Sequence, residues 1–437
     1  MIKVIYDISV LGVGYMIPTH KVGIYRVVEN LALELAKSQE INLFFSATKY
    51  YYRYHTLDFC LEYLKNNPQL KHIDLPHSPN KRYLYSHLNK IAFSLIHQIE
   101  TSNSKSTILT NKVLSKILDI INRIIYYSSE PIEPINLENT DIFHSTIYKI
   151  PQQVKNNKKI KRILTVYDLI PILYRDFFTL KPGQTHFVKY VLDSLSIDDW
   201  AICISECTKN DLCNYKKIDP NRVFVTHLAA DSTVFYPCKD AEKKELVIEK
   251  YNIPEVPYFL SLSTLEPRKN ISHVIRCFLD LIQQQGIKDI NLVLVGAKGW
   301  KYEEIFEQIP HNPTLTNRII FTGYVEDEDL AIIYSNAIAF IYMSFYEGFG
   351  LPPLEAMQCG LPVITSNTSS LPEVVGNAGI MLDPKDSGTL SQTMLDIYKN
   401  YELRQELSKK SLQRSQNFSW NKCAQETIDV YKIALQQ

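Results

Sequence analysis

Two glutamates and two glycines between residues 344 and 360 form the part of the sequence best suited to chemistry. The segment reads S-F-Y-E-G-F-G-L-P-P-L-E-A-M-Q-C-G, and seven residues separate Glu347 from Glu355. Gly348 and Gly350 permit a tight turn whose backbone N–H groups can face a ligand. The proline pair that follows suits the first turn of a helix. We expect Glu355 in that first turn, where carboxylates are favoured and where a phosphate could also bind.

A second charged cluster lies in the segment E-P-R-K-N, residues 266–270, directly after the apolar run 258–263. Arg268 can bind phosphate oxygens with its forked guanidinium group, and Lys269 adds a compact charge. The carboxyl end of a parallel strand is where doubly wound sheets bind ligands. Cations fixed there could bind a phosphate group of a ligand. Taken alone, the same Arg-Lys pair would be an ordinary solvated turn.

Short apolar runs that alternate with amphipathic stretches must hold these motifs in place. Such alternation predicts an α/β protein with doubly wound parallel sheets and helices on both faces. The chain has 437 residues, which is too long for one ordinary domain. The expected strands are residues 2–8, 141–145, 162–166, 201–205 and 222–225 in the first half, and 258–263, 291–296, 318–325, 337–342, 361–365 and 379–382 in the second.

These runs divide the chain into two expected domains and three further segments. The first domain covers residues 1–236, with a helical insertion at about 49–140, and a charged linker covers 237–257. The second domain covers 258–420, and a last helix covers 421–437.

The segment E-G-F-G-L-P-P-L-E resembles the E-x7-E signature of the retaining GT-B glycosyltransferases of family 4. These are group 1 glycosyl transferases, which include sucrose synthase-like and mannosyltransferase enzymes. E-P-R-K-N is similar to the family's diphosphate clamp, and G-I-Y-R at residues 23–26 is similar to its G-I-x-R element. The resemblance implies two Rossmann-like domains that face a cleft, with the last helix crossing back onto the first domain.

The resemblance also implies an activity. The expected enzyme moves a hexose, with retained configuration, from GDP-mannose or a UDP- or dTDP-hexose to a hydroxyl of a glycan or glycolipid. We expect it to act in cell-surface polysaccharide biosynthesis. The donor is a substrate, and no cofactor is expected. The base, the sugar and the acceptor are not encoded in these motifs.

Each motif residue takes a role through the same resemblance. Glu355 would accept hydrogen bonds from the ribose hydroxyls, and Glu347 would hold hydroxyls of the transferred sugar. Arg268 and Lys269 would bind the diphosphate. The remaining implied donor contacts are Phe349, Gly350 and Leu351 through backbone groups, Tyr324 and Val325 at the base, and Gly23 and Arg26 near the phosphates.

One loop departs from the family pattern. Residues 162–171 read R-I-L-T-V-Y-D-L-I-P and resemble a strand that ends in H-D-L-I-P, but Tyr167 stands where His is usual. We expect Tyr167 to pack on the sugar and Asp168 to orient a sugar or acceptor hydroxyl. The alternative is that Tyr167 is a core aromatic residue and that Asp168 only caps the loop. Because Tyr is neutral at pH 7, a histidine base would have to be His144, in the F-H-S element of 141–145. The resemblance implies that His144, like Tyr167, lies at the sugar or acceptor site.

The composition narrows the class of protein. The formal net charge is zero, so the chain lacks the basic character of a nucleic-acid-binding protein. Eight cysteines without a C-x-x-C pair indicate free thiols in a reducing compartment. With no leader and no membrane-spanning run in the sequence, we expect a cytoplasmic protein. Residues 49–162 hold seventeen Lys and Arg against nine Asp and Glu. This basic region is either a set of solvated helix faces or a peripheral contact with the inner membrane face and a lipid-linked acceptor.

Three further interpretations remain open at this stage. Asp327 and Asp329 form a D-x-D string, which could hold a metal, but a helical pattern follows it, so we expect acids of a first helical turn and no essential metal. A glycoside hydrolase could use Glu347 and Glu355 as its two carboxyl groups, which leaves the Arg-Lys pair without a role. A catalytically silent nucleotide-sugar-binding protein would keep every motif.

Overall fold

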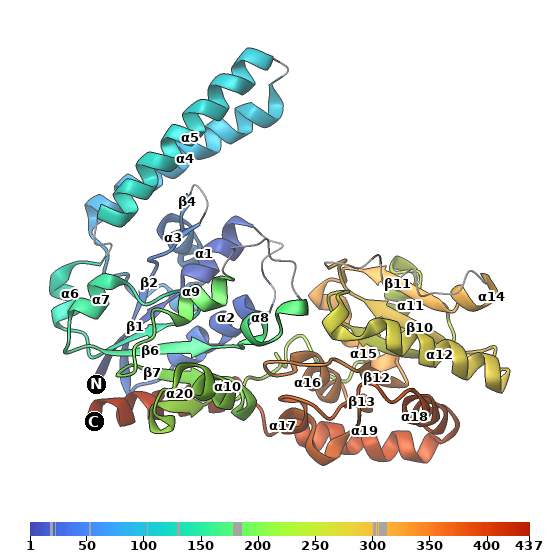
Figure 1. The fold of residues 1–437 in the computed structure, drawn as a ribbon. Helices are drawn as coiled ribbons and strands as arrows, with labels where there is room; N and C mark the ends of the chain where they lie inside the picture. Colours follow the sequence, from blue (N-terminus) through green and yellow to red (C-terminus); the bar gives the residue numbers. More distant parts are fainter. Residues whose placement is uncertain are drawn as a thin grey trace.

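The computed structural model describes residues 1–17, 21, 23–51, 54–102, 104–128, 132–177, 186–299, 303, 305 and 313–437. It contains two six-stranded sheets, each built from parallel strands with helices on both faces (Figure 1). The predicted pair of doubly wound domains is therefore confirmed.

The first sheet has the order β2-β1-β5-β6-β7-β8. Its strands are β1 (Ile2–Asp7), β2 (Ile41–Ser46), β5 (Ile142–Ser145), β6 (Lys161–Val166), β7 (Trp200–Cys203) and β8 (Val223–Val225). A two-stranded ribbon of β3 (Tyr50–Tyr51) and β4 (Tyr54–His55) is added after β2. Strands β5 and β7 are buried along their whole length, as expected for parallel strands covered on both faces.

The second sheet has the order β11-β10-β9-β12-β13-β14. Its strands are β9 (Tyr258–Leu262), β10 (Asn291–Val295), β11 (Ile319–Gly323), β12 (Ala339–Tyr342), β13 (Val363–Ser366) and β14 (Ile380–Leu382). The strand order reverses between β9 and β12, which pair directly. In open α/β sheets, the crevice at the carboxyl ends of two such strands is the usual ligand site.

Helices of the first domain alternate with its strands. They are α1 (Ser9–Met16), α2 (Ile24–Leu35), α3 (Thr56–Asn66), α4 (Pro79–Thr101), α5 (Lys105–Ser128), α6 (Pro134–Glu138), α7 (Gln152–Asn156), α8 (Ile170–Leu173), α9 (Phe187–Leu192) and α10 (Glu206–Lys216). The expected insertion contains the long hairpin of α4 and α5, which projects from the domain (Figure 1).

Helices of the second domain follow the same plan. They are α11 (Ala241–Lys250), α12 (Ile271–Gln285), α14 (Pro313–Thr316), α15 (Asp327–Asn336), α16 (Leu351–Gln358), α17 (Leu371–Val375), α18 (Ser387–Lys399) and α19 (Tyr401–Ser415). Helix α11 lies within the stretch that the sequence marks as a linker. Its residues Val247 and Ile248 are buried in the core of the second domain, where α11 packs against α15.

The last helix, α20 (Trp420–Gln436), returns to the first domain as the resemblance implies. It packs against α2, and Tyr431 and Ala434 are buried with Tyr6 in the first domain's core. Figure 1 accordingly shows the two termini close together beside the first sheet. No helix among the described residues is long and apolar enough to cross a membrane.

Candidate functional site

The two charged motifs meet at the strand-order reversal of the second sheet. E-P-R-K-N follows β9, and its residues Pro267–Lys269 form a single helical turn. E-G-F-G-L-P follows β12, on the neighbouring strand. The backbone N–H of Phe345 donates to the carbonyl of Arg268 over 3.0 Å, and the Ser344 hydroxyl donates to the same carbonyl over 3.2 Å. The two loops are therefore fixed to one another.

Glu347 is the centre of this contact. Its carboxylate lies 2.7 Å from Lys269 Nζ and 2.9 Å from Arg268 Nη1, and it accepts a 2.9 Å hydrogen bond from the Tyr342 hydroxyl. Burial alone would raise the pKa of Glu347, but the charges of Lys269 and Arg268 outweigh it and lower the pKa to about 2. Glu347 is thus ionised at neutral pH and holds both cations at one point.

Two further side chains complete the orientation of these cations. Glu266 is buried and pairs with Arg268 Nη2 at 2.7 Å, so the guanidinium lies between two carboxylates. Lys269 Nζ donates to the Tyr342 hydroxyl at 2.7 Å. Sequence reasoning assigned no role to Glu266 or Tyr342. Glu266 is the first residue of the E-P-R-K-N motif, and this position is the feature of the sequence that points to it.

Glu355 lies on α16, but not where the sequence analysis expects it. The helix begins at Leu351, one residue before the proline pair, so Glu355 is its fifth residue and lies at the start of the second turn. Its carboxylate is buried and accepts a 3.2 Å hydrogen bond from the Tyr334 hydroxyl. Burial raises the pKa of Glu355 to about 7, although the nearby Arg26 guanidinium and Tyr334 act in the opposite direction. This carboxyl group can therefore change its charge near neutral pH.

The turn between the two glutamates is held by serines of the next strand-helix loop. The Ser370 hydroxyl donates to the carbonyls of Glu347 and Phe349, at 3.0 and 2.6 Å. Ser369 Oγ accepts from the backbone N–H of Glu347 at 2.9 Å. Gly350, with φ of +123°, precedes the helix in a conformation that other residues rarely adopt. The Phe349 ring is buried in the core, which leaves only its backbone for a ligand.

Gly348 brings the two domains into direct contact. A Cβ atom at this position would lie 2.4 Å from the Tyr167 carbonyl oxygen and 3.0 Å from Asp168 Cβ. The Ser205 hydroxyl donates to the Gly348 carbonyl at 2.7 Å, and Glu373 accepts from the first two N–H groups of α10. Because Tyr167 follows β6, the carboxyl edge of the first sheet faces that of the second.

Asp168 caps its loop and also lies near the cation pair. Its Oδ1 accepts a 2.9 Å hydrogen bond from the backbone N–H of Ile170, so it does cap the loop. Burial raises the pKa of Asp168, while Arg268 and Lys269 lower it, because the carboxyl group also faces the cation pair. The Tyr167 side chain is half-buried and packs against the second domain's core.

His144 is not brought to this site. Its side chain is fully buried, with Nδ1 2.7 Å from the Tyr431 hydroxyl and Nε2 2.7 Å from Thr165 Oγ1. Burial lowers the pKa of His144 to about 3. With both ring nitrogens bonded to protein atoms, His144 anchors α20 to the first sheet, and nothing in its surroundings supports the expected contact with sugar or acceptor.

Arg26 crosses between the domains at the other side of the site. Its guanidinium forms an ion pair with Asp327 at the start of α15, and Gly23, with φ of +51°, precedes α2. Tyr324 is 63% exposed, whereas Val325 is buried. The ion pair with Asp327 therefore brings Arg26 to the second domain, whereas Phe349 and Val325 turn their side chains into the core.

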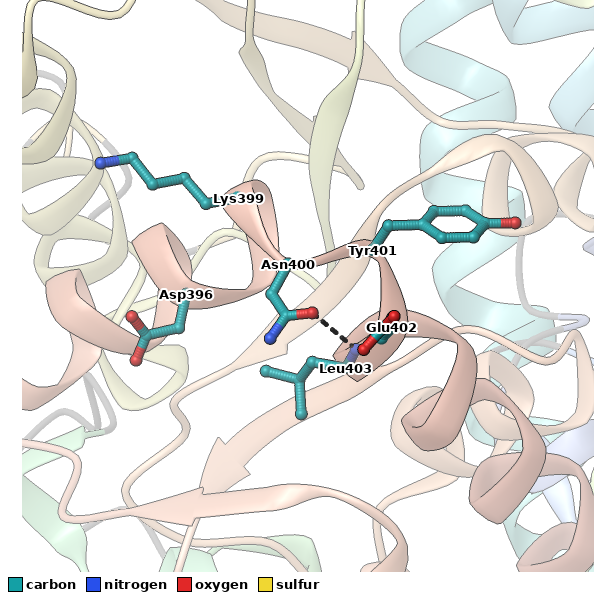
Figure 2. Close-up of a pocket in the computed structure, with 6 residues that line it drawn as sticks. All are labelled: Asp396, Lys399, Asn400, Tyr401, Glu402 and Leu403. Atoms are coloured by element: carbon teal, nitrogen blue, oxygen red, sulfur yellow. Dashed lines mark hydrogen bonds between the residues drawn. The ribbon is translucent and has the colours of Figure 1, made fainter.

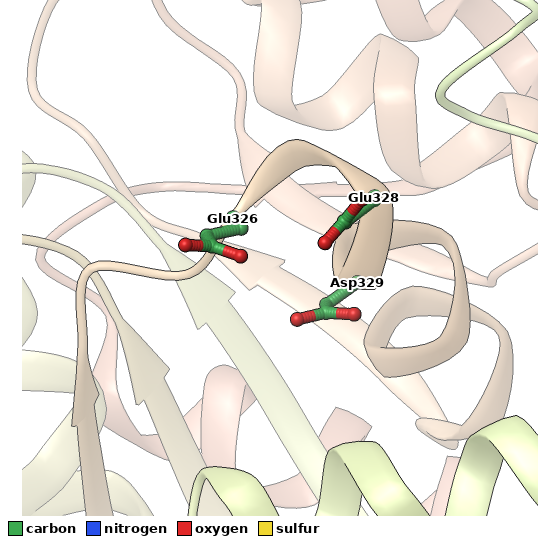
Figure 3. A group of neighbouring side chains, drawn as sticks. All are labelled: Glu326, Glu328 and Asp329. Atoms are coloured by element: carbon green, nitrogen blue, oxygen red, sulfur yellow. The ribbon is translucent and has the colours of Figure 1, made fainter. Parts of the chain in front are cut away.

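The D-x-D string occupies the first turn of α15, as predicted. Figure 3 shows Glu326, Glu328 and Asp329 close together at the start of this helix. Lys250 lies 3.1 Å from Glu326 and 2.8 Å from Asp329, so a lysine already neutralises part of this charge. The expectation that no metal is essential stays a prediction.

A surface depression lies elsewhere, at the junction of α18 and α19 (Figure 2). Its lining residues run from Asp396 to Leu403, and Asn400 caps α19 by accepting from the Leu403 N–H at 3.0 Å. None of its six lining residues belongs to the motifs above, so we attribute no substrate to it.

The sequence is similar to those of known proteins. Residues 243–414 match the family described as Glycosyl transferases group 1. The chain is 32% identical over 292 residues to the O-antigen chain mannosyltransferase B of Escherichia coli, covering 67% of this chain and 74% of that protein. It is 29% identical over 293 residues to the serotype-specific mannosyltransferase WbdA of Escherichia coli, but spans only 36% of WbdA.

Solved structures agree on the fold. A glycosyltransferase from Rickettsia africae has a TM-score of 0.63 and 18% identity, with 100% of this chain and 99% of that chain covered. Anabaena HepE, solved with UDP-glucose, has a TM-score of 0.63 and 13% identity, with 99% of this chain and 100% of that chain covered. The two sheets and these neighbours define a GT-B glycosyltransferase fold. The chain belongs to the group 1 glycosyl transferases and is a glycosyltransferase.

Proposed function

We propose that the chain transfers a hexose, with retained configuration, from a nucleoside diphosphate sugar to a hydroxyl of a growing glycan or glycolipid. GDP-mannose is the first candidate donor because the aligned relatives are named mannosyltransferases. A UDP- or dTDP-hexose is the second, since HepE was solved with UDP-glucose. The observation that carries the proposal is the convergence of Arg268 and Lys269 on Glu347 at the strand-order reversal.

The charge arrangement suits a departing diphosphate. When the bond between the anomeric carbon and the β-phosphate oxygen breaks, the diphosphate gains negative charge, and the acceptor hydroxyl forms the new bond on the same face. The acceptor proton passes to the leaving phosphate oxygen. Arg268 and Lys269, already oriented by Glu347, would stabilise this charge more strongly in the transition state than in the ground state. Glu347 would then be shared between the cations and the sugar hydroxyls.

The hydroxyl-binding carboxylates have separate tasks in this proposal. Glu355 would accept hydrogen bonds from the ribose, and Asp168 would orient a hydroxyl from the first domain's side of the cleft. The proposed acceptor binds along the carboxyl edge of the first sheet. We retain the expectation that the enzyme works on the cytoplasmic side without a cofactor or an essential metal. The hydrolase alternative loses its support for two reasons. The Glu347 carboxylate forms ion pairs with Arg268 and Lys269, and the family consists of transferases.

The remaining alternative, a silent nucleotide-sugar-binding protein, can be tested directly. Purified protein is first screened for thermal stabilisation by GDP, UDP and dTDP, which identifies the base. The matching nucleoside diphosphate hexose is then incubated without acceptor, and release of nucleoside diphosphate is measured. An enzyme should release it slowly, with water as the acceptor, and Glu347→Ala should abolish the release. Stabilisation by a nucleotide with no release from any donor, even with added membrane glycolipids, would identify a binder and reject the proposal.

A further inference from the structure

The helical hairpin of the first domain carries an apolar face that no described part of the chain covers. Helices α4 and α5 pack side by side and project away from the domain (Figure 1). Seven aliphatic residues of α5 are between 43% and 66% exposed. They are Leu109, Val113, Leu114, Ile117, Ile120, Ile121 and Ile124. Their spacing of three, four or seven residues places them along one side of the helix.

The opposite side of α5, which packs on α4, is unusually polar. Asn111, Ser115 and Asn122 are all buried there, together with Leu118. The Asn111 side chain donates to Gln98 of α4 at 2.9 Å. A hairpin surrounded by water would normally bury its aliphatic side chains and expose its polar ones. This reversed arrangement indicates that the outer side of α5 meets an apolar partner.

The charges of the hairpin restrict the kind of partner. Residues 79–128 contain seven Lys and Arg against two Asp and Glu, although the whole chain has no net charge. Lys105, Lys112 and Lys116 are exposed and, at a spacing of seven and four residues, follow one edge of the apolar face. Two copies of so basic a hairpin would repel each other. A partner with an apolar interior beneath a negatively charged surface would match both the aliphatic face and the lysines along its edge. An anionic phospholipid bilayer has these properties.

We propose that the outer face of α5 docks the enzyme onto an anionic phospholipid bilayer. The aliphatic side chains enter the boundary between headgroups and acyl chains, and the lysines along their edge contact lipid phosphates. The helix lies in the interface plane, consistent with the finding that no described helix could span a membrane. Docking of this kind would hold the enzyme where lipid-linked acceptors are concentrated, but it requires neither the donor chemistry nor the proposed acceptor.

Vesicle flotation of the full-length protein tests this proposal. Vesicles of phosphatidylcholine mixed with phosphatidylglycerol are compared with vesicles of phosphatidylcholine alone. The unaltered protein should float with the anionic vesicles and much less with the neutral ones. The double variant Ile117→Ser, Ile120→Ser should lose about tenfold or more in vesicle partitioning, because two buried aliphatic side chains are removed from the lipid. Lys112→Glu with Lys116→Glu should also weaken binding. The loss should grow as the salt concentration is lowered, because weaker screening strengthens the repulsion between the new carboxylates and the anionic surface.

A matched control carries the same chemical change elsewhere. Ile135 and Ile197 are 63% and 66% exposed and lie outside the hairpin, so Ile135→Ser with Ile197→Ser should leave vesicle binding unchanged. Circular dichroism and thermal melting check that each variant is folded. The proposal is overturned if the unaltered protein stays with the unbound fraction. It is also overturned if light scattering reveals a dimer that Ile117→Ser, Ile120→Ser dissociates, since a second copy would then cover the face.

Discussion

Protonation of Glu355 should control donor binding around neutral pH. Burial raises the pKa of this carboxyl group to about 7. The ionised carboxylate offers both oxygens as strong, charged acceptors to two ribose hydroxyls, whereas protonation weakens these hydrogen bonds and turns one oxygen into a donor. The dissociation constant of the donor should therefore rise about tenfold for each pH unit below about 7, and stay constant above it. Glu355→Gln should bind the donor weakly and without this pH dependence.

The neighbours of Glu355 provide a sharper test, because they move its pKa in opposite directions. The Arg26 guanidinium lowers the pKa of Glu355, and the Asp327 carboxylate raises it. Arg26→Ala should therefore shift the midpoint of the binding profile to higher pH, and Asp327→Asn should shift it to lower pH. Overall affinity will also change, so the midpoint is the quantity to compare.

Isothermal titration calorimetry with an intact nucleoside diphosphate sugar is the suitable assay. A free nucleoside diphosphate is avoided because its terminal phosphate titrates at a pH of about 6. An affinity for the unaltered protein that does not change between about pH 8 and pH 6 would refute the reasoning. The same holds if Glu355→Gln keeps the pH dependence of its parent.

Four further substitutions test other contacts of the site. Glu347→Gln should cost on the order of 3 kcal/mol of stability at neutral pH, because the folded pKa of about 2 lies below the ordinary value of 4.5. This contribution is present above about pH 4.5 and lost as the pH falls towards 2, so denaturant titrations at neutral and acidic pH should converge for the two proteins. Gly348→Ala should lower turnover by forcing the turn away from the Tyr167 carbonyl, and unchanged turnover would show that the domains need not approach this closely. Asp168→Asn should lose most turnover and Tyr167→Phe should keep most of it, both with an unchanged melting temperature; equal activities would contradict the assigned roles.

Much of the fold follows from local sequence patterns. Runs such as 258–263 and 337–342 are short, apolar and without helical period, and they became the buried strands β9 and β12. The motifs that follow them were placed at strand ends from the sequence alone. Their meeting at one crevice follows from the order of parallel strands, a general property of doubly wound sheets.

Contacts between distant parts of the chain could not be predicted in this way. His144 bonds to Tyr431, 287 residues away, and no local pattern marks that pairing. The ion pair of Arg26 with Asp327 joins two domains, so neither helix pattern contains it. Glu355 falls at the start of the second turn and not in the first, because α16 begins at Leu351, one residue before the proline pair that suits a first turn. Periodicity specifies which side of an element is buried, but not its partner.

The exposed face of α5 shows a different limit. Its leucine and isoleucine spacing predicts an amphipathic helix, and the natural assumption is that the apolar side faces the protein. Only the structure reveals that Asn111 and Ser115 face α4 while Ile117 and Ile120 face outwards.

The central claim is that Arg268 and Lys269 stabilise a departing diphosphate. Steady-state kinetics of Arg268→Ala and Lys269→Ala test it most directly, with the exposed Lys409→Ala on α19 as the control. We predict that kcat falls by about a hundredfold or more in each site variant while the donor KM changes much less, because the charge grows toward the transition state. Lys409→Ala should match the unaltered enzyme. A raised donor KM with unchanged kcat would contradict the claim.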